Sequence, residues 1–334
     1  MIIENRKPEL VSIIVPCYNE EKTIVELLEA IMVQTYPREF IEVIIADGLS
    51  TDHTREVIRE FSDQHRFLIV RLIDNPTRTI PAGLNLAIQT AKGEIIVRLD
   101  AHSKPYPDYV QRCVASLNES KGDNVGGLWE ILPRNDSWQA YAIALAAAHP
   151  LAVGDARYRY SDQAGFVETV PFGAFYKLLI DKIGAYDESL LTNEDYEFNT
   201  RIHQAGGKIW FDPKIRSIYY ARANLVELAR QYWRYGYWKA RMLRRYPKTI
   251  RWRQALPPLF VLSLAVLFFA SIWLPIAGWL IVLELGSYVT ILFLVGLQSA
   301  WKHKRHGLLI GVPLAIACMH FSWGSAFLWS FLKP

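Results

Sequence analysis

The chain has 334 residues, of which 51% are hydrophobic and 21% are charged, and its formal net charge at pH 7 is +4. This length exceeds that of one ordinary domain and is typical of a catalytic domain with an appendage. The hydrophobic excess is concentrated after Pro257, which argues against a protein that is soluble along its whole length.

Short apolar runs alternate with amphipathic stretches in the N-terminal part of the chain. The apolar runs predict buried strands at residues 11–16, 42–46, 67–73 and 94–99. Between these runs, apolar residues recur at helical spacing in residues 21–34, 54–65 and 81–92. Strands that alternate with helices indicate an α/β fold with a mainly parallel sheet, covered by helices on both faces.

Polar side chains stand where these predicted strands end. Asn19 and Glu20 follow the first strand, Asp47 follows the second, and Asp100 and His102 follow the fourth. Ligands of open α/β sheets bind outside the carboxyl ends of the strands. The sequence therefore predicts that these residues share one ligand site.

A basic and aromatic segment follows residues 126–222, a less regular stretch that we interpret as the acceptor-facing half of the same domain. Basic residues with aromatics are compatible with nucleic-acid binding, but their place directly before a hydrophobic span favours a membrane interface. We therefore expect membrane lipid, and no nucleic acid, as the partner of this segment. Its basic residues are Arg222, Arg230, Arg234, Lys239, Arg241, Arg244, Arg245, Lys248, Arg251 and Arg253.

Three hydrophobic stretches, residues 256–274, 276–297 and 307–332, make up the C-terminal part. Each is close to the ~20 residues that cross a bilayer, and none has the polar outer face of a soluble helix. Basic segments before the first stretch and between the second and third predict an in–out–in–out path with a tight external turn at Pro275. The N-terminal sequence MIIENRKPEL has no apolar signal core, so we expect the globular domain on the cytoplasmic side of the cell (inner) membrane.

Asp47 and the Asp100–His102 pair are candidates for donor binding. A carboxylate at the end of a buried strand can bind a nucleobase or ribose, but the turn after Asp47 also fits a helix cap. Residues two apart in an extended segment point the same way, so Asp100 and His102 could share a divalent ion. One carboxylate and one imidazole suit manganese slightly better than magnesium. The alternative is that both are ordinary polar loop residues.

Glu194 and Asp195 form a second acidic site. Transfer to a hydroxyl group needs a base near the nucleophile, and a carboxylate can serve. The alternative is the first turn of a helix, where acids are favoured, although this explains one acid better than two.

Gln231, Arg234 and Tyr235 are spaced so that they share one face of a helix. An arginine at such a position suits a phosphate group. The alternative is contact with phospholipid headgroups.

Five segments, taken in order, resemble the motifs of a family 2 glycosyltransferase of the GT-A fold. They are VSIIVPCYNE, ADGLSTDHT, RLDAHS, NEDYEF and QYWRY. The resemblance implies that Pro16, Asn19 and Glu20 lie in the first nucleotide-binding loop and that Asp47 contacts the base. It also implies that Asp100 is the first acid of the D-x-D metal motif.

The same resemblance extends to the later motifs. It implies that Asp195, with Glu194 beside it, is the catalytic base of the ED motif in an inverting reaction. Gln231, Arg234 and Tyr235 resemble Q-x-x-R-W, which contacts the diphosphate and the acceptor in synthases.

Three positions depart from the family pattern. Gly48 stands where many relatives have a second aspartate, so the contacts to the base are expected to differ. His102 replaces the later acid of D-x-D and can still ligate a metal. Tyr235 replaces tryptophan and leaves the acceptor platform aromatic but smaller.

A further resemblance is to ExoA-like succinoglycan glucosyltransferases. It rests on the segments NPTRTIPAGLNLAI and RLDAHS together with the hydrophobic C-terminal spans. Arg78, in the first of these segments, is assigned to the donor site. The implied organisation is a GT-A catalytic domain at residues 1–222, interfacial helices at 223–254 and a three-helix transmembrane region at 255–334. The implied reaction transfers a sugar, expected to be glucose, from a UDP-sugar to a polyprenyl-diphosphate-linked saccharide in exopolysaccharide synthesis. Its cofactor would be Mn²⁺ or Mg²⁺.

Other functions remain open from the sequence. A polyprenyl-phosphate hexose synthase would use the lipid phosphate itself as acceptor. A processive polysaccharide synthase ranks lower because three spans are too few to enclose a polymer channel. A membrane scaffold or transporter subunit is disfavoured because Glu284 is the only charged residue that we find within the spans.

Overall fold

The chain forms two compact units in a computed structural model that describes residues 8–119 and 121–333. The first unit comprises the chain up to Glu130 together with Ser161–Tyr219, and the second comprises Ile131–Tyr160 and the chain from Tyr220 onward. The predicted catalytic segment, residues 1–222, differs from the first unit mainly in Ile131–Tyr160, which packs with the C-terminal helices. Residues 1–7, on which part of the no-signal expectation rests, lie outside the described residues.

Four parallel strands form one half of the sheet in the first unit. They are β1 (Val11–Cys17), β2 (Ile41–Asp47), β3 (Ile69–Asp74) and β4 (Ile95–Arg98), in the spatial order β3-β2-β1-β4. Every residue of β2 and β4 is buried, which explains why these segments are continuous apolar runs rather than alternating ones. The α/β fold predicted from these runs is confirmed.

The other half of the sheet is antiparallel where the pairing is described. The order continues β8-β6-β9-β5, and β7 pairs with β9. The sheet is therefore mixed. The sequence did not resolve this half because several of its strands have only two or three residues. Its strands are β5 (Lys104–Pro105), β6 (Asn124–Leu132), β7 (Gly165–Phe166), β8 (Ala174–Tyr176) and β9 (Ile209–Tyr220).

Helices cover the sheet of the first unit. In α1 the residues Ile24, Leu27, Leu28 and Ile31 are buried at helical spacing and join the main core with alternate residues of β1. Proline at the second position of α3 fits the start of that helix, where no backbone donor is required. The helices of this unit are α1 (Ile24–Met32), η1 (Arg38–Phe40), α2 (Thr54–Gln64), α3 (Ile80–Thr90), α4 (Tyr109–Asn118), α7 (Leu179–Ile183) and α8 (Glu194–Gln204).

The second unit is helical outside the ends of β6 and β9. Three of its helices are long and apolar enough to cross a membrane, as the sequence predicted: α10 (Trp252–Ala270), α11 (Pro275–His303) and α12 (Leu308–Leu332). Rings of Phe260, Tyr288 and Phe321, one from each helix, lie with centroids 4.6–6.2 Å apart. The remaining helices are α5 (Trp138–Ala147), α6 (Pro150–Val153), η2 (Arg157–Arg159), α9 (Leu225–Arg245) and η3 (Pro247–Thr249).

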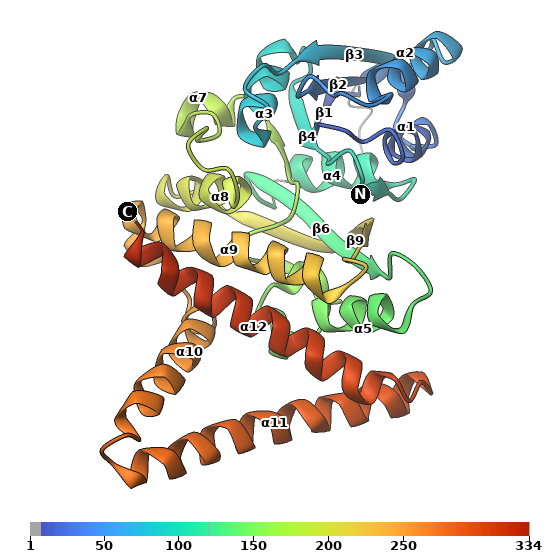
Figure 1. Cartoon of the computed structure of the whole chain (residues 1–334). Coiled ribbons are helices and arrows are strands. Elements are labelled where there is room, and N and C mark those ends of the chain that lie inside the picture. The colour runs from blue at the N-terminus through green and yellow to red at the C-terminus, as the bar shows by residue number, and fades with distance from the viewer. Residues whose placement is uncertain (1–7, 120, 334) are drawn as a thin grey trace. The chain divides into compact units, whose positions relative to one another are not determined.

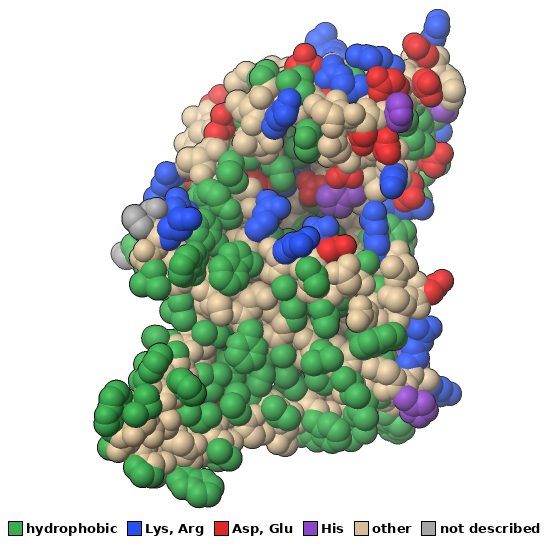
Figure 2. Space-filling view, in the orientation of Figure 1, with side chains coloured by type: hydrophobic (Ala, Val, Ile, Leu, Met, Phe, Trp, Pro, Cys, Tyr) green, Lys and Arg blue, Asp and Glu red, His purple; other side chains and the backbone are tan. Residues whose placement is uncertain are grey.

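Within this unit, Figure 1 shows α9 and α12 side by side, with α10 and α11 diverging from them. On the face shown in Figure 2, apolar side chains cover α10 and α11. These helices have little protein around them, which is the arrangement expected of helices that contact lipid. Their exposed large side chains include Leu256, Leu259, Val266, Phe268, Phe269, Ile276, Trp279, Val282, Leu283, Val289 and Phe293.

Candidate active site

The ends of three parallel strands lie in register at one edge of the sheet. Cys17 of β1 pairs with Asp47 of β2, and Asp47 pairs with Asp74 of β3. Pro16 pairs with Ala46 one residue earlier. The polar loops that follow these strands are therefore brought together, as expected for the ligand edge of a parallel sheet.

Hydrogen bonds join the loop after β1 to the loop after β2. The backbone N–H of Asn19 donates to Ser50 Oγ at 2.8 Å, and the N–H of Glu20 donates to Thr54 Oγ1 at 2.8 Å. In return, the N–H of Thr51 donates to Asn19 Oδ1 at 2.8 Å. Asn19 adopts a left-handed φ of 54°, a conformation that asparagine tolerates better than most residues.

Asp47 is completely buried, and both of its carboxylate oxygens already accept hydrogen bonds. Ser50 donates from its hydroxyl at 2.5 Å and from its backbone N–H at 3.0 Å, while Arg55 Nη1 donates at 2.7 Å. Arg55 also bonds Asp74 at 2.8 Å. Asp47 thus orders the turn that leads into α2. This structural role resembles the helix-capping alternative that the sequence left open.

Arg78 lies beside Gly48, between β3 and α3. A Cβ at Gly48 would stand 3.1 Å from the Tyr18 ring and 3.5 Å from Arg78 Cα, so glycine lets the three loops approach. The Arg78 side chain is exposed and its backbone φ is 57°, which is uncommon for arginine. Strained backbone of this kind clusters at ligand sites.

Glu20, Asp100 and His102 come from the ends of neighbouring strands β1 and β4. His102 Nδ1 lies 3.0 Å from Glu20 Oε1, and the hydroxyl of Thr23 also bonds Glu20. Asp100 is a quarter exposed, and its Oδ1 lies 3.3 Å from Arg98 Nη2. The structure therefore brings the predicted metal residues to the same edge as the predicted nucleotide loops.

The donor set of Asp100 and His102 fits a divalent cation that arrives with a diphosphate. Among the described residues there is no group of three histidine, cysteine or acidic side chains able to hold a metal by itself. Cations of the magnesium type are commonly held by one or two carboxylates together with substrate phosphates and water. An open site of one carboxylate and one imidazole matches that pattern.

A buried ion pair links β4 to α8. Arg98 and Glu194 are 4% and 6% exposed, and Arg98 Nη2 donates to Glu194 Oε1 at 2.7 Å. Burial lowers the pKa of Arg98, but the carboxylates of Asp100 and Glu194 outweigh it and hold that pKa well above its ordinary value. Arg98 thus stays charged and forms ion pairs with Asp100 and with Glu194.

Asp195, the second acid of that pair, is only half-buried. It lies in the first turn of α8, two residues after Asn193, whose φ of 67° is left-handed. Its Oδ1 accepts a hydrogen bond from the Tyr196 N–H at 2.7 Å. Burial and then the neighbouring charge of Glu194 raise the pKa of Asp195 to about 7, against the lowering effect of Arg98. The two acids therefore differ: Glu194 is buried and ion-paired, whereas Asp195 is accessible and poised near neutrality.

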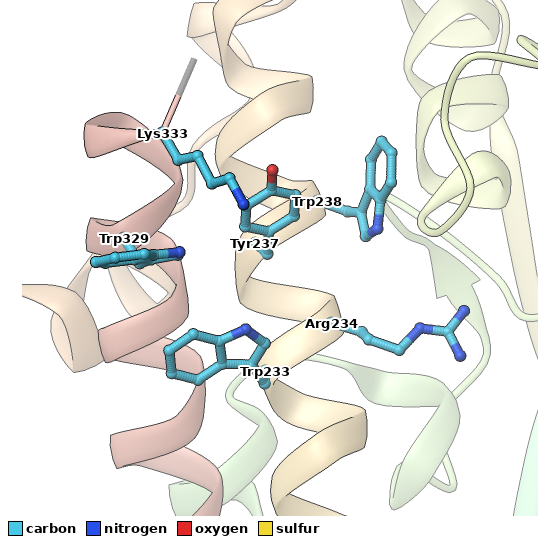
Figure 3. Close-up of a pocket in the computed structure, with 6 residues that line it drawn as sticks. All are labelled: Trp233, Arg234, Tyr237, Trp238, Trp329 and Lys333. Atoms are coloured by element: carbon cyan, nitrogen blue, oxygen red, sulfur yellow. The ribbon is translucent and has the colours of Figure 1, made fainter.

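The predicted acceptor residues lie on α9, in the second unit. Gln231 Nε2 donates to Tyr235 Oη at 3.1 Å, so these two side chains are brought together. Arg234 instead lines a pocket of about 230 Å³ that α9 and α12 form. In Figure 3, Lys333, directly after the end of α12, reaches toward Tyr237, while Arg234 and Trp238 project from α9 on the other side. The other lining residues are Trp233 and Trp329.

Sequence reasoning missed Arg98 and Arg55. Arg98 is a charged residue inside the apolar run EIIVRL, and a charge in a buried strand requires a partner. That signal points to a buried ion pair, although not to Glu194 as the partner. For Arg55 the helical spacing gave no comparable signal, because the first turn of α2 is polar throughout.

Comparison with known proteins identifies the family. The model of glycosyl transferase family 2 matches residues 12–177. The succinoglycan biosynthesis protein ExoA of Rhizobium meliloti is 30% identical over 318 residues, which cover 94% of this chain and 93% of the relative. The chain belongs to glycosyltransferase family 2. It is therefore a glycosyltransferase enzyme.

Two further similarities support the assignment to this family and its fold. A dolichyl N-acetyl-α-D-glucosaminyl phosphate 3-β-D-2,3-diacetamido-2,3-dideoxy-β-D-glucuronosyltransferase of Methanococcus voltae is 30% identical over 72% of this chain and 76% of the relative. The solved mannosyltransferase PcManGT of Pyrobaculum calidifontis, in complex with GDP-Man and Mn²⁺, superposes with a TM-score of 0.65. That comparison covers 92% of this chain and 87% of the other at 22% identity, and it confirms the GT-A fold.

Proposed function

We propose that this family 2 enzyme transfers a hexose, glucose in the first instance, from a UDP-sugar to a lipid-linked saccharide with inversion at the anomeric carbon. The observation that carries the proposal is the contrast between Glu194 and Asp195. A base for an acceptor hydroxyl must be accessible and should have a pKa near the working pH. Asp195 meets both conditions, and Arg98 ties its neighbour Glu194 to the metal motif through Asp100.

In the proposed reaction, Asp195 accepts the proton of the acceptor hydroxyl as that oxygen attacks the anomeric carbon. The bond between the anomeric carbon and the UDP oxygen breaks, and UDP leaves from the opposite face of the sugar. The loops of Asn19, Glu20 and Arg78 would hold the nucleotide, and Asp100 and His102 would hold a divalent cation. When bound, that cation supplies positive charge for the departing diphosphate.

The proposed acceptor is a saccharide on a polyprenyl diphosphate at the cytoplasmic face of the membrane. The relative from Methanococcus voltae supports a lipid-linked acceptor, since it is named for a dolichyl-phosphate-linked sugar. The relative from Rhizobium meliloti is named for succinoglycan biosynthesis and supports a role in polysaccharide synthesis. The apolar helices α10–α12 would keep the enzyme at the membrane, where such acceptors reside. Tethering of this kind raises the effective acceptor concentration without any new contact.

The proposal is tested by a transfer assay with purified full-length enzyme in detergent or nanodiscs. UDP-glucose, UDP-N-acetylglucosamine and GDP-mannose are offered in parallel with polyprenyl phosphate and with a polyprenyl-diphosphate-linked saccharide. We expect transfer from a UDP-sugar to the linked saccharide. Transfer to polyprenyl phosphate alone would instead identify a polyprenyl-phosphate hexose synthase. A preparation that is folded but transfers no sugar from any donor would contradict the proposal.

The metal assignment gives a prediction on donor binding. Asp100→Ala should abolish the increase in UDP affinity that Mn²⁺ causes, because the only carboxylate of the proposed pair is lost. His102→Asp should keep part of that increase, because a carboxylate also ligates Mn²⁺. Calorimetry with and without EDTA measures the effect. If both variants respond to Mn²⁺ like the wild type, the cation is held elsewhere.

The raised pKa of Asp195 predicts the acidic limb of the pH profile. Only the deprotonated carboxylate can accept the acceptor proton, so kcat/KM should rise about tenfold per pH unit below pH 7 and level off above it. The measurement is kcat/KM between pH 5 and pH 9 at saturating acceptor. A profile that stays flat down to pH 5 would show that no group with this pKa acts as the base.

A further inference from the structure

Helix α12 differs from the other two apolar helices in how much protein surrounds it. In its most hydrophobic stretch 39% of the residues are buried, against 6% for α10 and 11% for α11. Its exposed large side chains are Ile310, Leu314, Phe321, Trp329, Phe331 and Leu332. Ile310, Leu314, Phe321 and Leu332 recur at spacings of four, seven and eleven and so form one stripe. One face of α12 is thus covered by protein along the helix, and the opposite face carries an exposed apolar stripe that the rings of Phe260 in α10 and Tyr288 in α11 contact at Phe321.

Much of the cover is α9, which contacts the second half of α12 between Cys318 and Ser330. Near the start of α9, Cys318 Sγ donates to the carbonyl oxygen of Leu225 at 3.5 Å. Further along, a Cβ at Gly236 would lie 2.3 Å from the carbonyl oxygen of Trp323. Near the end of α9, Arg244 Nη2 donates to the carbonyl oxygen of Ser330 at 2.5 Å. The two helices run in the same direction, side by side (Figure 1).

Helix α9 cannot lie inside the hydrocarbon of a bilayer. From Leu225 to Arg244 it extends about 29 Å at ~1.5 Å per residue, close to the ~30 Å hydrocarbon thickness. A charged side chain inside the hydrocarbon is costly. Helix α9 carries a charged side chain at almost every turn. The pocket side chains Trp233, Tyr237 and Trp238 are of the type enriched at the membrane–water boundary. Its basic residues are Arg230, Arg234, Lys239, Arg241, Arg244 and Arg245.

The other end of α12 packs against α5. A Cβ at Gly311 would stand 2.7 Å from Ala142 Cβ. In the basic loop before α12, the Arg305 guanidinium lies 4.1 Å from the ring centroid of Tyr141. Both ends of α12 therefore lie beside cationic side chains, Arg305 at one end and Arg244 at the other. A helix that crossed the bilayer would place one of these cations on the far side.

We propose that α12 lies in the plane of the membrane interface and that only α10 and α11 cross the bilayer. Its apolar stripe would rest on the acyl chains, while the exposed cations of α9, Arg230, Arg234, Arg244 and Arg245, would face anionic lipid headgroups. The C-terminus is then on the same side as the loop that contains Lys304. This path has two crossings and replaces the in–out–in–out path expected from composition alone. It does not depend on the proposed reaction.

Cysteine accessibility tests this topology in the full-length protein. Cys17 and Cys113 are buried, so Cys318→Ser gives a suitable background. Single cysteines are introduced by Leu274→Cys between α10 and α11, Lys304→Cys between α11 and α12, and Lys333→Cys at the end of α12. Spheroplasts that express each variant are treated with a membrane-impermeant maleimide before and after permeabilisation.

The proposal predicts that Leu274→Cys is labelled in intact spheroplasts, whereas Lys304→Cys and Lys333→Cys are labelled at least tenfold more after permeabilisation. All three positions flank helices and are exposed in the structure, so the substitutions leave the packed faces unchanged. Labelling of Lys333→Cys in intact spheroplasts would overturn the proposal, because α12 would then cross the bilayer. Protection of Leu274→Cys in intact spheroplasts would also overturn it, because α10 and α11 would not reach the other side.

Discussion

The Asp195→Asn variant is expected to lose about 10²–10⁴-fold in turnover while it binds UDP nearly as well as the wild type. Asparagine keeps the shape of the side chain and can still accept the hydrogen bond from the Tyr196 N–H. It cannot accept a proton from the acceptor hydroxyl. The loss should therefore fall on kcat, because the interaction exists only as the proton is transferred.

Glu194→Gln is the matched control for this prediction. It removes a carboxylate one residue away, but that carboxylate is buried and bonded to Arg98. We expect this variant to lose thermal stability and to lose less turnover than Asp195→Asn. Steady-state transfer, UDP calorimetry and melting curves on both variants separate the two roles. If Glu194→Gln were the inactive variant and Asp195→Asn retained turnover, the roles would have to be exchanged.

Among the substitutions considered, Arg98→Met is expected to lower the free energy of unfolding most. It leaves Glu194 buried without its cation, and removing one partner of a buried pair typically costs about 3–5 kcal/mol. For a unit of 150–250 residues this corresponds to a Tm lower by roughly 6–20 °C, since 1 kcal/mol shifts Tm by about 2–4 °C. Calorimetry or thermal fluorescence of the purified variant measures the shift.

Two further variants test whether the loss of stability in Arg98→Met comes from the broken ion pair with Glu194. Arg98→Lys preserves the charge but loses the guanidinium geometry, so its Tm should lie between those of Arg98→Met and the wild type. The double variant Arg98→Met with Glu194→Gln should lose less stability than the sum of the two single variants. Each single substitution leaves one charged partner buried without its counter-charge, whereas the double variant leaves none. A wild-type Tm for Arg98→Met would mean that the ion pair contributes nothing to the stability of the fold.

Much of the first unit could be predicted because the strands β1, β2 and β4 are buried on both faces. The runs that contain Ile13, Val43 and Val97 are predominantly apolar, and such runs are read directly from a sequence. The antiparallel half could not be predicted, since β5 and β7 have two residues each and are defined by their partners. The packing of Ile131–Tyr160 with the C-terminal helices depends on tertiary contacts, such as that of Gly311 with α5.

The candidate site shows the same division. The sequence predicted one ligand site for Glu20, Asp100 and His102, and the structure adds that His102 contacts Glu20 because β1 and β4 are neighbours. The family resemblance implied that Asp195 is the base, but the residue pattern gave no physical reason to prefer it over Glu194. That difference depends on burial and on the position of Arg98. It also could not show that the carboxylate of Asp47 is already occupied by Ser50 and Arg55.

The anomeric configuration of the product tests the proposed mechanism most directly. The enzyme is incubated with an α-linked UDP-sugar and a polyprenyl-diphosphate-linked saccharide, and the purified product is examined by NMR spectroscopy. Direct attack by the acceptor, with Asp195 as the base, predicts a new β-linkage, identified by its anomeric proton coupling. A new α-linkage would contradict single displacement and would exclude Asp195 from the role proposed for it.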